Sequence, residues 1–386
     1  MIFIIFVCLS IYGSMKLIIS SQELLKGAMS VSKAIPAKSS LSILENFLFC
    51  LEGDQLEITA FDQELALRTR IQVEQGLEDG RIAVPARHLI DLLKELPDQP
   101  ITIKTIQENY FLCSWMGGES TLPYFSADEY PAITTTDETA TTVNFPAQIL
   151  VDGISSTIYA TDDDEMRPVM NGILFDMNPS GTTFVASDSR KLVCFTTTAV
   201  TVEEQSSFIL HKKPAGILRS IIGKDTKDVE ISYDNKNAVF KFDGTMVVCR
   251  LIVGKYPKYR EVIPQNNSNI LRIDRLQLLN CVKRVSVCAN KASNQIRFDL
   301  KSDSLEISAQ DLGFSIAAHE KLACQYDGQE LKIGFKSTFL AEILSNLNSS
   351  EVIVKFADQR RAALLLPADE GETTETVYGI LMPVQI

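Results

Sequence analysis

Apolar residues along this chain follow two rhythms, and the first is helical. Near the start, Leu24, Leu25, Ala28 and Met29 recur at helical spacing. The string Ser20-Ser21-Gln22-Glu23 before them is a capping box, in which a serine hydroxyl and a glutamate carboxylate each satisfy a free backbone N–H. The pattern therefore predicts a helix that begins at this string.

A second helix is predicted after Val84-Pro85, because proline suits a helix start and the leucines that follow share one face. These leucines are Leu89, Leu92, Leu93 and Leu96. The same rhythm predicts four more helices, near residues 146–159, 211–222, 274–290 and 336–348. Gly223 is placed to end the helix over 211–222.

The second rhythm is the alternation of apolar and polar residues that is typical of β-strands. It runs through short segments between the helices, which predict antiparallel strands over residues 101–106, 229–233 with 238–242, and 352–356 with 362–366. Helices followed by short strands indicate an α+β fold, in which helices pack on one face of an antiparallel sheet.

The sequence repeats itself three times. LEITAFDQELALRT (56–69), TTFVASDSRKLVCF (182–195) and LEISAQDLGFSIAA (305–318) align on Asp62, Asp188 and Asp311, which are 126 and 123 residues apart. Tyr130-Pro131 and Tyr256-Pro257 are also 126 residues apart. An apolar, strand-like run precedes each aspartate: FLFCLEG (47–53), NGILFDM (171–177) and IRFDLKS (296–302). Repeats at this spacing indicate tandem copies of one domain.

The repeat predicts three domains, over residues 15–136, 141–264 and 268–386, each with two helices and several short strands. Polar, aperiodic links near Thr134–Thr142 and Gln265–Asn269 separate them.

Residues 1–14 precede the first copy and begin with the apolar string MIFIIFVCLSIY. A secretory signal needs a basic region before its apolar run, and the first basic residue here is Lys16. The string is also too short to span a bilayer. We therefore expect a mis-annotated leader and a true start at Met15.

The net charge is −12 and the pI about 4.9, which argues against a protein that coats nucleic acid with a generally basic surface. The charge is uneven, however. The six predicted helices together carry +5 and the rest of the chain −17. Lysine and arginine are good helix formers, so mild enrichment needs no function. Alternatively, the helices share a surface that faces a polyanion. The count alone does not separate these explanations.

Catalytic and metal-binding chemistry is sparse. The eight cysteines are scattered without a C-x-x-C, which favours reduced, buried thiols. The three histidines are far apart, so a zinc site is not expected. Common phosphate-binding and nucleophile motifs are absent. The acidic run Asp162–Glu165 lacks the glycine of a calcium loop, and we interpret it as a solvated, mobile loop. The three repeated aspartates are expected to cap turns through backbone N–H groups.

Several strings resemble one protein family. The start MKLIISSQELL, ASDSRKLV (186–193), KYPKYREVIP (255–264) and the terminal YGILMPVQI occur in the order found in the bacterial β sliding clamp, the processivity subunit of DNA polymerase III. The resemblance covers residues 15–386. It implies a non-catalytic, head-to-tail homodimer that closes a six-domain ring, with helices lining the hole and sheets outside. Such a ring encircles duplex DNA without reading its sequence and tethers the polymerase.

The resemblance also implies three sets of site residues. The DNA-facing set is Lys38, Arg87, Lys212, Lys213 and Lys291, and the dimer-interface set is Leu122, Val287 and Cys288. A hydrophobic cleft between the second and third domains captures linear peptides from polymerases, the clamp loader and repair proteins. Its residues are Met170, Ser187, Ser189, Arg190, Lys191, Leu192, Pro257, Val262, Phe339, Ala362, Ile380, Leu381, Met382, Pro383 and Val384. For the DNA-facing residues the alternative is a solvated surface charge, and for the interface and cleft residues it is ordinary core packing.

The chain departs from the family at several of these sites. Ser189-Arg190-Lys191 stands where the family often has Gly-His-Arg. Glu261 replaces a common arginine, and Gln385 replaces a frequent penultimate arginine. We expect a cleft with a shifted peptide preference. Pro168 replaces an aromatic residue beside the DNA path in some relatives, so that contact is not carried over.

Two other classes of protein compete with this interpretation. A three-repeat scaffold that binds protein or glycan outside the cytoplasm is favoured only by the apolar leader. An enzyme needs a convergent set of acid, base, nucleophile or metal ligands, which the sequence does not offer. The sequence therefore predicts a cytoplasmic sliding clamp without catalytic residues, metal or cofactor.

Overall fold

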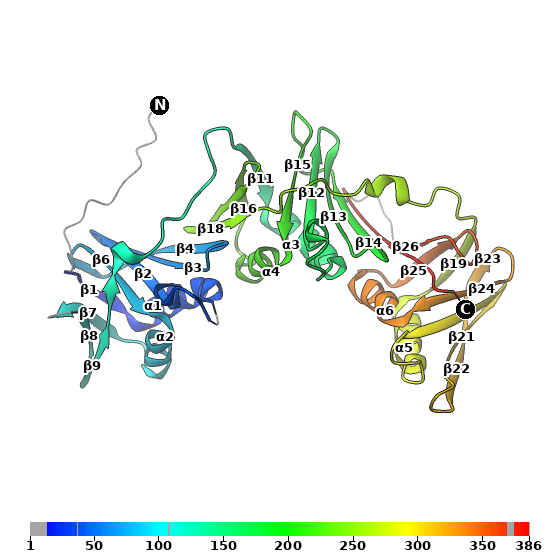
Figure 1. Cartoon of the computed structure of the whole chain (residues 1–386), viewed down its shortest axis with the longest axis horizontal. Coiled ribbons are helices and arrows are strands. Elements are labelled where there is room, and N and C mark those ends of the chain that lie inside the picture. The colour runs from blue at the N-terminus through cyan, green and yellow to red at the C-terminus, as the bar shows by residue number, and fades with distance from the viewer. Residues whose placement is uncertain (1–13, 37, 107–108, 369–373, 386) are drawn as a thin grey trace. The chain divides into compact units, whose positions relative to one another are not determined.

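The computed structural model describes residues 14–36, 38–106, 109–368 and 374–385 (Figure 1). The predictions about the leader up to residue 13, Cys8 included, lie outside the described residues. By its contacts the chain divides into two compact units. The first consists of the residues up to 145 together with 220–250, and the second of residues 146–219 together with 251–386.

The first unit holds two antiparallel sheets. The five-stranded sheet has the order β5-β1-β7-β8-β9, formed by β5 (Gln75–Glu78), β1 (Lys16–Ser20), β7 (Pro100–Ile106), β8 (Tyr110–Trp115) and β9 (Gly118–Pro123). The nine-stranded sheet has the order β10-β6-β2-β3-β4-β18-β17-β16-β11. Its strands are β10 (Phe125–Ser126), β6 (Gly80–Pro85), β2 (Asn46–Glu52), β3 (Gln55–Phe61), β4 (Leu65–Gln72), β18 (Thr245–Arg250), β17 (Asn237–Phe242), β16 (Asp228–Tyr233) and β11 (Thr141–Pro146).

Two helices of the first unit, α1 (Ser21–Val31) and α2 (Ala86–Glu95), pack against each other. The Ser20 hydroxyl accepts hydrogen bonds from the backbone N–H groups of Gln22 and Glu23, at 3.2 and 3.3 Å, which confirms the predicted helix start. Of the predicted apolar stripes, Leu24 and Leu89 are fully buried, whereas Met29 is 43% exposed. These helices cover one face of the strands, as an α+β fold requires.

The second unit also holds two antiparallel sheets. The nine-stranded sheet has the order β15-β12-β13-β14-β27-β26-β25-β19-β23, formed by β15 (Ser206–His211), β12 (Gly172–Asn178), β13 (Gly181–Ser187), β14 (Lys191–Thr197), β27 (Glu375–Leu381), β26 (Ala363–Pro367), β25 (Glu351–Phe356), β19 (Asn269–Asp274) and β23 (Gln325–Asp327). The four-stranded sheet has the order β22-β21-β20-β24, formed by β22 (Ile316–Ala323), β21 (Ser304–Asp311), β20 (Gln295–Lys301) and β24 (Leu331–Lys336).

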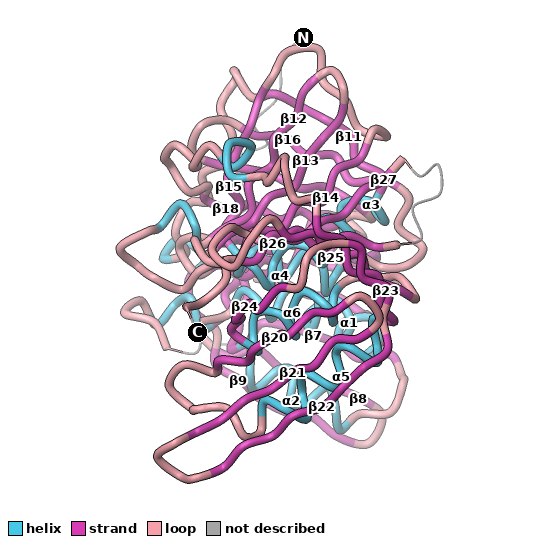
Figure 2. Tube along the Cα trace, turned by 90° about the vertical axis from the view of Figure 1, so that its right-hand side faces the viewer, coloured by secondary structure: helices cyan, strands magenta, loops and turns pink. Residues whose placement is uncertain are grey.

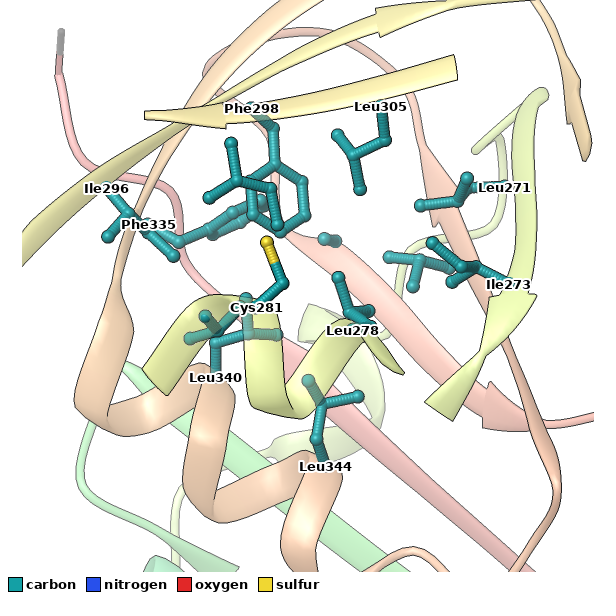
Figure 3. Packing of buried hydrophobic residues seen from close by; sticks show 14 of the residues in the cluster. Leu271, Ile273, Leu278, Cys281, Ile296, Phe298, Leu305, Phe335, Leu340 and Leu344 are labelled. Atoms are coloured by element: carbon teal, nitrogen blue, oxygen red, sulfur yellow. The ribbon is translucent and has the colours of Figure 1, made fainter. Parts of the chain in front are cut away.

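Four helices belong mainly to the second unit: α3 (Ala147–Thr157), α4 (Lys212–Ile221), α5 (Arg275–Ser286) and α6 (Ser337–Asn346). Helices α5 and α6 pack together over the core of the third copy, where the Cys281 thiol points toward Phe298 (Figure 3). Helix α3 lies close to β13 at Gly153, where an added Cβ would come within 2.7 Å of the Phe184 ring. Glycine is needed there for helix and sheet to approach.

Each nine-stranded sheet is shared by two copies of the repeat. Strand β4 of the first copy pairs with β18 of the second, and β14 of the second pairs with β27 of the third. The second copy is therefore split between the two units, with β11 and β16–β18 in one and β12–β15 in the other. The domain boundaries drawn from the repeat stay predictions, because hydrogen bonding passes from copy to copy.

The repeated aspartates cap turns, as predicted. The Asp62 carboxylate accepts hydrogen bonds from the N–H groups of Glu64 and Leu65, and Asp188 accepts them from Arg190 and Lys191. Asp311 accepts one from Gly313. All three turns lead out of a central strand, so the repeat preserves a local backbone shape rather than a catalytic group.

The structure also corrects details. Helix α5 ends at Ser286, short of residue 290, because the N–H groups of Val287 and Cys288 turn to carbonyls three residues back. The residues predicted as links include Thr141 and Asn269, which already belong to strands β11 and β19. Among the described cysteines, Cys50, Cys288 and Cys324 are only half-buried, whereas the other four are buried as predicted. No helix in the described residues is both long and apolar enough to cross a membrane.

Candidate functional site

Part of the predicted cleft forms one apolar row across neighbouring strands. Ile380 of β27 pairs with Leu192 of β14 on one side and with Leu364 of β26 on the other. The row belongs to a cluster with Tyr256 and Tyr259, against which Ala362 packs. This cluster lies at the join between second-copy and third-copy strands. Shared sheet hydrogen bonding therefore brings residues distant in the sequence to one surface.

Other predicted cleft residues lie on the opposite face of the same sheet. Lys191 and Leu381 pair with each other and alternate with Leu192 and Ile380, so their side chains point the other way. Leu381 is fully buried in the third-copy core. It therefore packs beneath the sheet and is not accessible to a ligand. Half-buried Phe339 of α6 packs against that same core.

Lys191 is a buried cation with many partners. Only 5% of it is exposed, and its ammonium forms ion pairs with Glu342 and with Asp188, the latter at 3.8 Å. The ammonium also lies 4.8 Å from the centroid of the Phe339 ring and 5.8 Å from that of Tyr159. Burying a charge is tolerated only when it is paired in this way. Lys191 thus connects β14 to α6 and has little charge left for a ligand.

The turn between β13 and β14 contacts the segment that contains Arg167 and Met170, which precedes β12. Ser189 has a positive φ of 73°, and its hydroxyl accepts a hydrogen bond from Arg167 at 2.5 Å and contacts the Met170 sulfur at 3.3 Å. Ser187 is buried, and its hydroxyl donates to the carbonyl of Lys191 at 2.9 Å. The family's frequent glycine at position 189 fits this left-handed backbone, which the serine here adopts under strain.

The C-terminal segment closes the end of the sheet. The Met382 N–H donates to the Arg190 carbonyl at 2.8 Å, and the Val384 N–H donates to the Gly334 carbonyl at 2.9 Å. Met382 is 46% exposed, while Pro383 and Val384 are half-buried. The segment therefore runs from the second copy to the third and lies between the two faces of the predicted cleft.

Pro257 and Val262 are exposed, and a polar anchor holds the segment that carries them. The carboxylate of Asp176 on β12 accepts hydrogen bonds from the Tyr259 hydroxyl and from Arg260, each at 2.8 Å. Burial raises the pKa of the Tyr259 hydroxyl, and burial also raises the pKa of the neighbouring Cys194 thiol to about 12. Both groups therefore stay protonated near neutrality.

Sequence reasoning missed several residues of this site. Leu364 and Tyr378 pack against the apolar row, and a usable signal was their alternation with predicted cleft residues: Tyr378 with Ile380, and Leu364 with Ala362. Tyr159, Glu342 and the Asp176 anchor had no such signal, because their partners are distant in the sequence and belong to other elements.

The predicted DNA-facing residues are placed as follows. Lys38, Arg87, Lys213 and Lys291 are exposed, on a loop, on α2, at the start of α4 and in the turn after α5. Lys212 differs: it is half-buried, donates to the Asp162 carbonyl at 3.1 Å and forms an ion pair with Asp163.

The acidic run is thus more than a solvated loop, which corrects our interpretation. Arg167 pairs with Asp162 at 2.8 Å and with Asp164 at 3.1 Å, and Lys212 pairs with Asp163. The backbone N–H of Met166 and the Arg167 guanidinium lower the pKa of Asp164. These exposed pairs are individually weak, but together they hold the run against the protein.

The predicted interface residues lie near open sheet edges. Leu122 lies on β9, the outer strand of the five-stranded sheet, and is half-buried. Val287 and Cys288 follow α5, with Val287 65% exposed.

The described residues contain no group of three or more His, Cys, Asp or Glu side chains that could hold a metal ion. The three repeated aspartates are engaged in turns, and the acidic run is engaged in ion pairs. The structure thus contains three copies of a two-helix unit, which are joined through shared antiparallel sheets and carry an apolar surface with polar edges.

Comparison with known proteins gives the family. Models of the DNA polymerase III beta subunit match in order: the N-terminal domain at residues 15–134, the central domain at 144–258 and the C-terminal domain at 260–384. The chain therefore belongs to the DNA polymerase III beta subunit family, the beta sliding clamps. This family is the non-catalytic processivity subunit, so the extracellular scaffold is not favoured.

Individual relatives agree over almost the whole chain. The beta sliding clamp of Synechococcus elongatus is 28% identical, covering 96% of this chain and 100% of that protein. The beta sliding clamp of Pseudomonas aeruginosa is 27% identical, covering 95% and 99%. The crystal structure of the Pseudomonas aeruginosa DNA polymerase III subunit beta has a TM-score of 0.91 at 26% identity, covering 96% of this chain and 100% of that one.

Proposed function

We propose that this chain is a DNA sliding clamp, in which two copies close head to tail into a six-domain ring around duplex DNA in the cytoplasm. The ring tethers the replicative polymerase and slides without reading sequence. The observation that carries the proposal is the match of all three repeat copies, in order, to the three domains of one clamp family. Processivity then arises because the closed ring cannot leave the DNA while it holds the polymerase, and the clamp itself makes or breaks no covalent bond.

Ring closure is supported by two of the outer strands, one in each unit. Strand β9 is outermost in the five-stranded sheet of the first unit, and β22 is outermost in the four-stranded sheet of the second. The β21–β22 hairpin extends away from the body of its unit (Figures 1 and 2). Unpaired edges invite pairing with another chain. Joining β9 of each chain to β22 of the other pairs both of these edges in a closed dimer.

Exposed apolar side chains accompany both edges. On the first copy Tyr110 is 49% exposed, and on the third Val287 and Phe314 are 65% and 77% exposed. Apolar patches at a sheet edge mark an interface rather than a free surface. We infer that Leu122 of one chain packs near Val287 and Cys288 of the other.

The helices supply the proposed DNA-facing surface. Counted over α1–α6 as observed, they carry a net charge of +4 in a chain of −12, with the excess on α4 and α5. Lys38, Arg87, Lys213 and Lys291 contact phosphates, while Lys212 shares its charge with the acidic run. Few and weak phosphate contacts suit a ring that slides.

The cleft is proposed to capture linear peptides from the polymerase, the clamp loader and repair proteins. An apolar anchor of the peptide packs on the Leu192–Ile380 row, and the chain then crosses Met382 toward Phe339 on the other face. Few polar groups and one apolar pocket are the usual composition of such sites.

Replacing Val287 by aspartate tests the ring. The wild type should run as a dimer in analytical ultracentrifugation and extend the products of the polymerase in the presence of the clamp loader. Val287→Asp should shift the dimer toward monomer and shorten the products, because it places a charge in an apolar interface. Val253→Asp is the matched control, since Val253 is 74% exposed and belongs to neither β9 nor β22. A monomeric wild type without loader-dependent stimulation would refute the proposal.

A further inference from the structure

Lys336 is an unusual residue for its place in the fold. It ends strand β24 and is the N-cap of α6, and its side chain makes no capping hydrogen bond. A positive charge at a helix N-terminus is unfavourable, because the free backbone N–H groups there are already partly positive. Helix stability therefore does not explain a lysine at this position.

Two ammonium groups share the ring of Phe339. That of Lys336 lies 4.3 Å from the ring centroid, and that of Lys191 lies 4.8 Å from it. The ring attracts each cation, but the two cations repel each other. Glu342 and Asp188 offset the charge of Lys191. Within the described residues, Lys336 has the ring contact and no carboxylate partner.

The carboxylates around the predicted cleft are already engaged. Asp176 binds Arg260 at 2.8 Å, Glu261 pairs with Lys258 at 2.8 Å, and the acidic run holds Arg167. The Arg190 side chain is exposed, and like Lys336 it has no ion pair in the described part of the chain. The charge left for a ligand at this site is therefore positive.

Lys336 also lies beside the C-terminal segment. It pairs across the sheet with Gln295, whose side-chain amide donates to the Gln385 carbonyl at 3.0 Å. Two residues before it, the Gly334 carbonyl accepts the hydrogen bond from Val384. Lys336 thus lies between Phe339 and the segment that closes the sheet, where a peptide crossing Met382 arrives.

From this geometry we infer that Lys336 determines specificity by pairing with an aspartate or glutamate of the partner peptide beside Phe339. The inference rests on the proposed peptide cleft and assigns it a ligand chemistry: an aliphatic anchor for the Leu192–Ile380 row, and an acidic side chain at the Phe339 end. A half-buried cation without a partner gains more from a carboxylate than a fully solvated one, because less water screens the pair.

The test uses the full-length dimer and two matched sets of short fluorescent peptides. Each peptide has a leucine anchor for the Leu192–Ile380 row, with one aspartate placed at each remaining position in turn; the second set has asparagine instead. Fluorescence anisotropy should find one position where aspartate binds the wild type about fivefold or more tightly than asparagine. Lys336→Gln should remove that preference and leave the asparagine peptide within about twofold.

Lys332→Gln is the matched control, because Lys332 lies on the same strand, is 58% exposed and pairs with Asp299 at 3.3 Å. It should keep the aspartate preference. Equal binding of the two sets to the wild type, or equal weakening of both by Lys336→Gln, would overturn the role of Lys336 while leaving the cleft in place. Binding of neither set to the wild type would overturn the cleft as well.

Discussion

Asp176 offers a sharp test of how the cleft is built. Its side chain is 8% exposed on β12 and accepts one hydrogen bond from the Tyr259 hydroxyl and one from the Arg260 guanidinium. These two residues begin the 3-10 turn η6 (Tyr259–Val262), next to Pro257. The carboxylate therefore fixes the segment between the second and third copies onto the second-copy sheet.

Asp176→Asn keeps the size of the side chain and removes its charge. A hydrogen bond to a charged group is worth about 1.5–3 kcal/mol, and losing a buried ion pair costs about 3–5 kcal/mol. The lower figure applies here, because the Arg260 side chain is 57% exposed and returns to water. We expect a loss of about 2 kcal/mol in the free energy of unfolding, together with weaker peptide binding as the Pro257 wall loosens.

Urea denaturation followed by circular dichroism measures the loss, and a double-mutant cycle with Tyr259→Phe isolates the coupling. Glu261→Gln is the control, because its pair with Lys258 is exposed on both sides and should contribute less than about 0.5 kcal/mol. If Asp176→Asn cost no more than Glu261→Gln, or if the cycle showed no coupling, the anchor would not act as described.

Four further outcomes are expected. Deleting Met382–Ile386 should abolish binding of a polymerase-derived peptide but leave the dimer intact in ultracentrifugation; unchanged affinity would count against the cleft. Cys288 should react with a maleimide slowly in the dimer and faster after dilution to monomer, as mass spectrometry reports; equal rates would place it outside the interface. Lys213→Gln should reduce the salt dependence of DNA binding by about 0.9 in log–log slope, whereas Lys301→Gln on β20 should not. Burial raises the pKa of Cys249 from 9.0 to about 12, so its thiol ionises first in the unfolded chain. Stability should therefore fall as pH rises from about 9 to 12, and Cys249→Ala should lessen the slope in urea denaturation; an unchanged slope would contradict it.

Local signals in the sequence predicted much of the fold. The Ser20 cap and the turns at Asp62 and Asp188 depend on residues two or three positions apart, so the pattern contains the whole interaction. The strand alternation likewise placed β7, β16, β17, β25 and β26 to within one or two residues. The end of α5 was not predictable, because Val287–Ala289 keep a helical composition while their hydrogen bonds shift by one residue.

The site was less accessible, because its key pairs are distant in the sequence. Asp176 meets Arg260 84 residues away, and Lys191 meets Glu342 151 residues away. In the sequence, Lys191 next to Arg190 has the pattern of an exposed charge. Only the strand register shows that its side chain points to the buried face. The acidic run was interpreted as solvated although its partner Arg167 is close in the sequence; its other partner, Lys212, lies 50 residues on. Charge pairs of this kind follow from topology, which a local pattern does not encode.

The most direct test of the ring is its behaviour on DNA without ends. After loading by the clamp loader, the protein should stay on a circular primed plasmid through gel filtration at moderate salt. Cutting the circle once should release it, because a ring that holds DNA by topology slides off a free end. Retention on the linear molecule, or loss from the uncut circle at the same rate, would contradict encirclement.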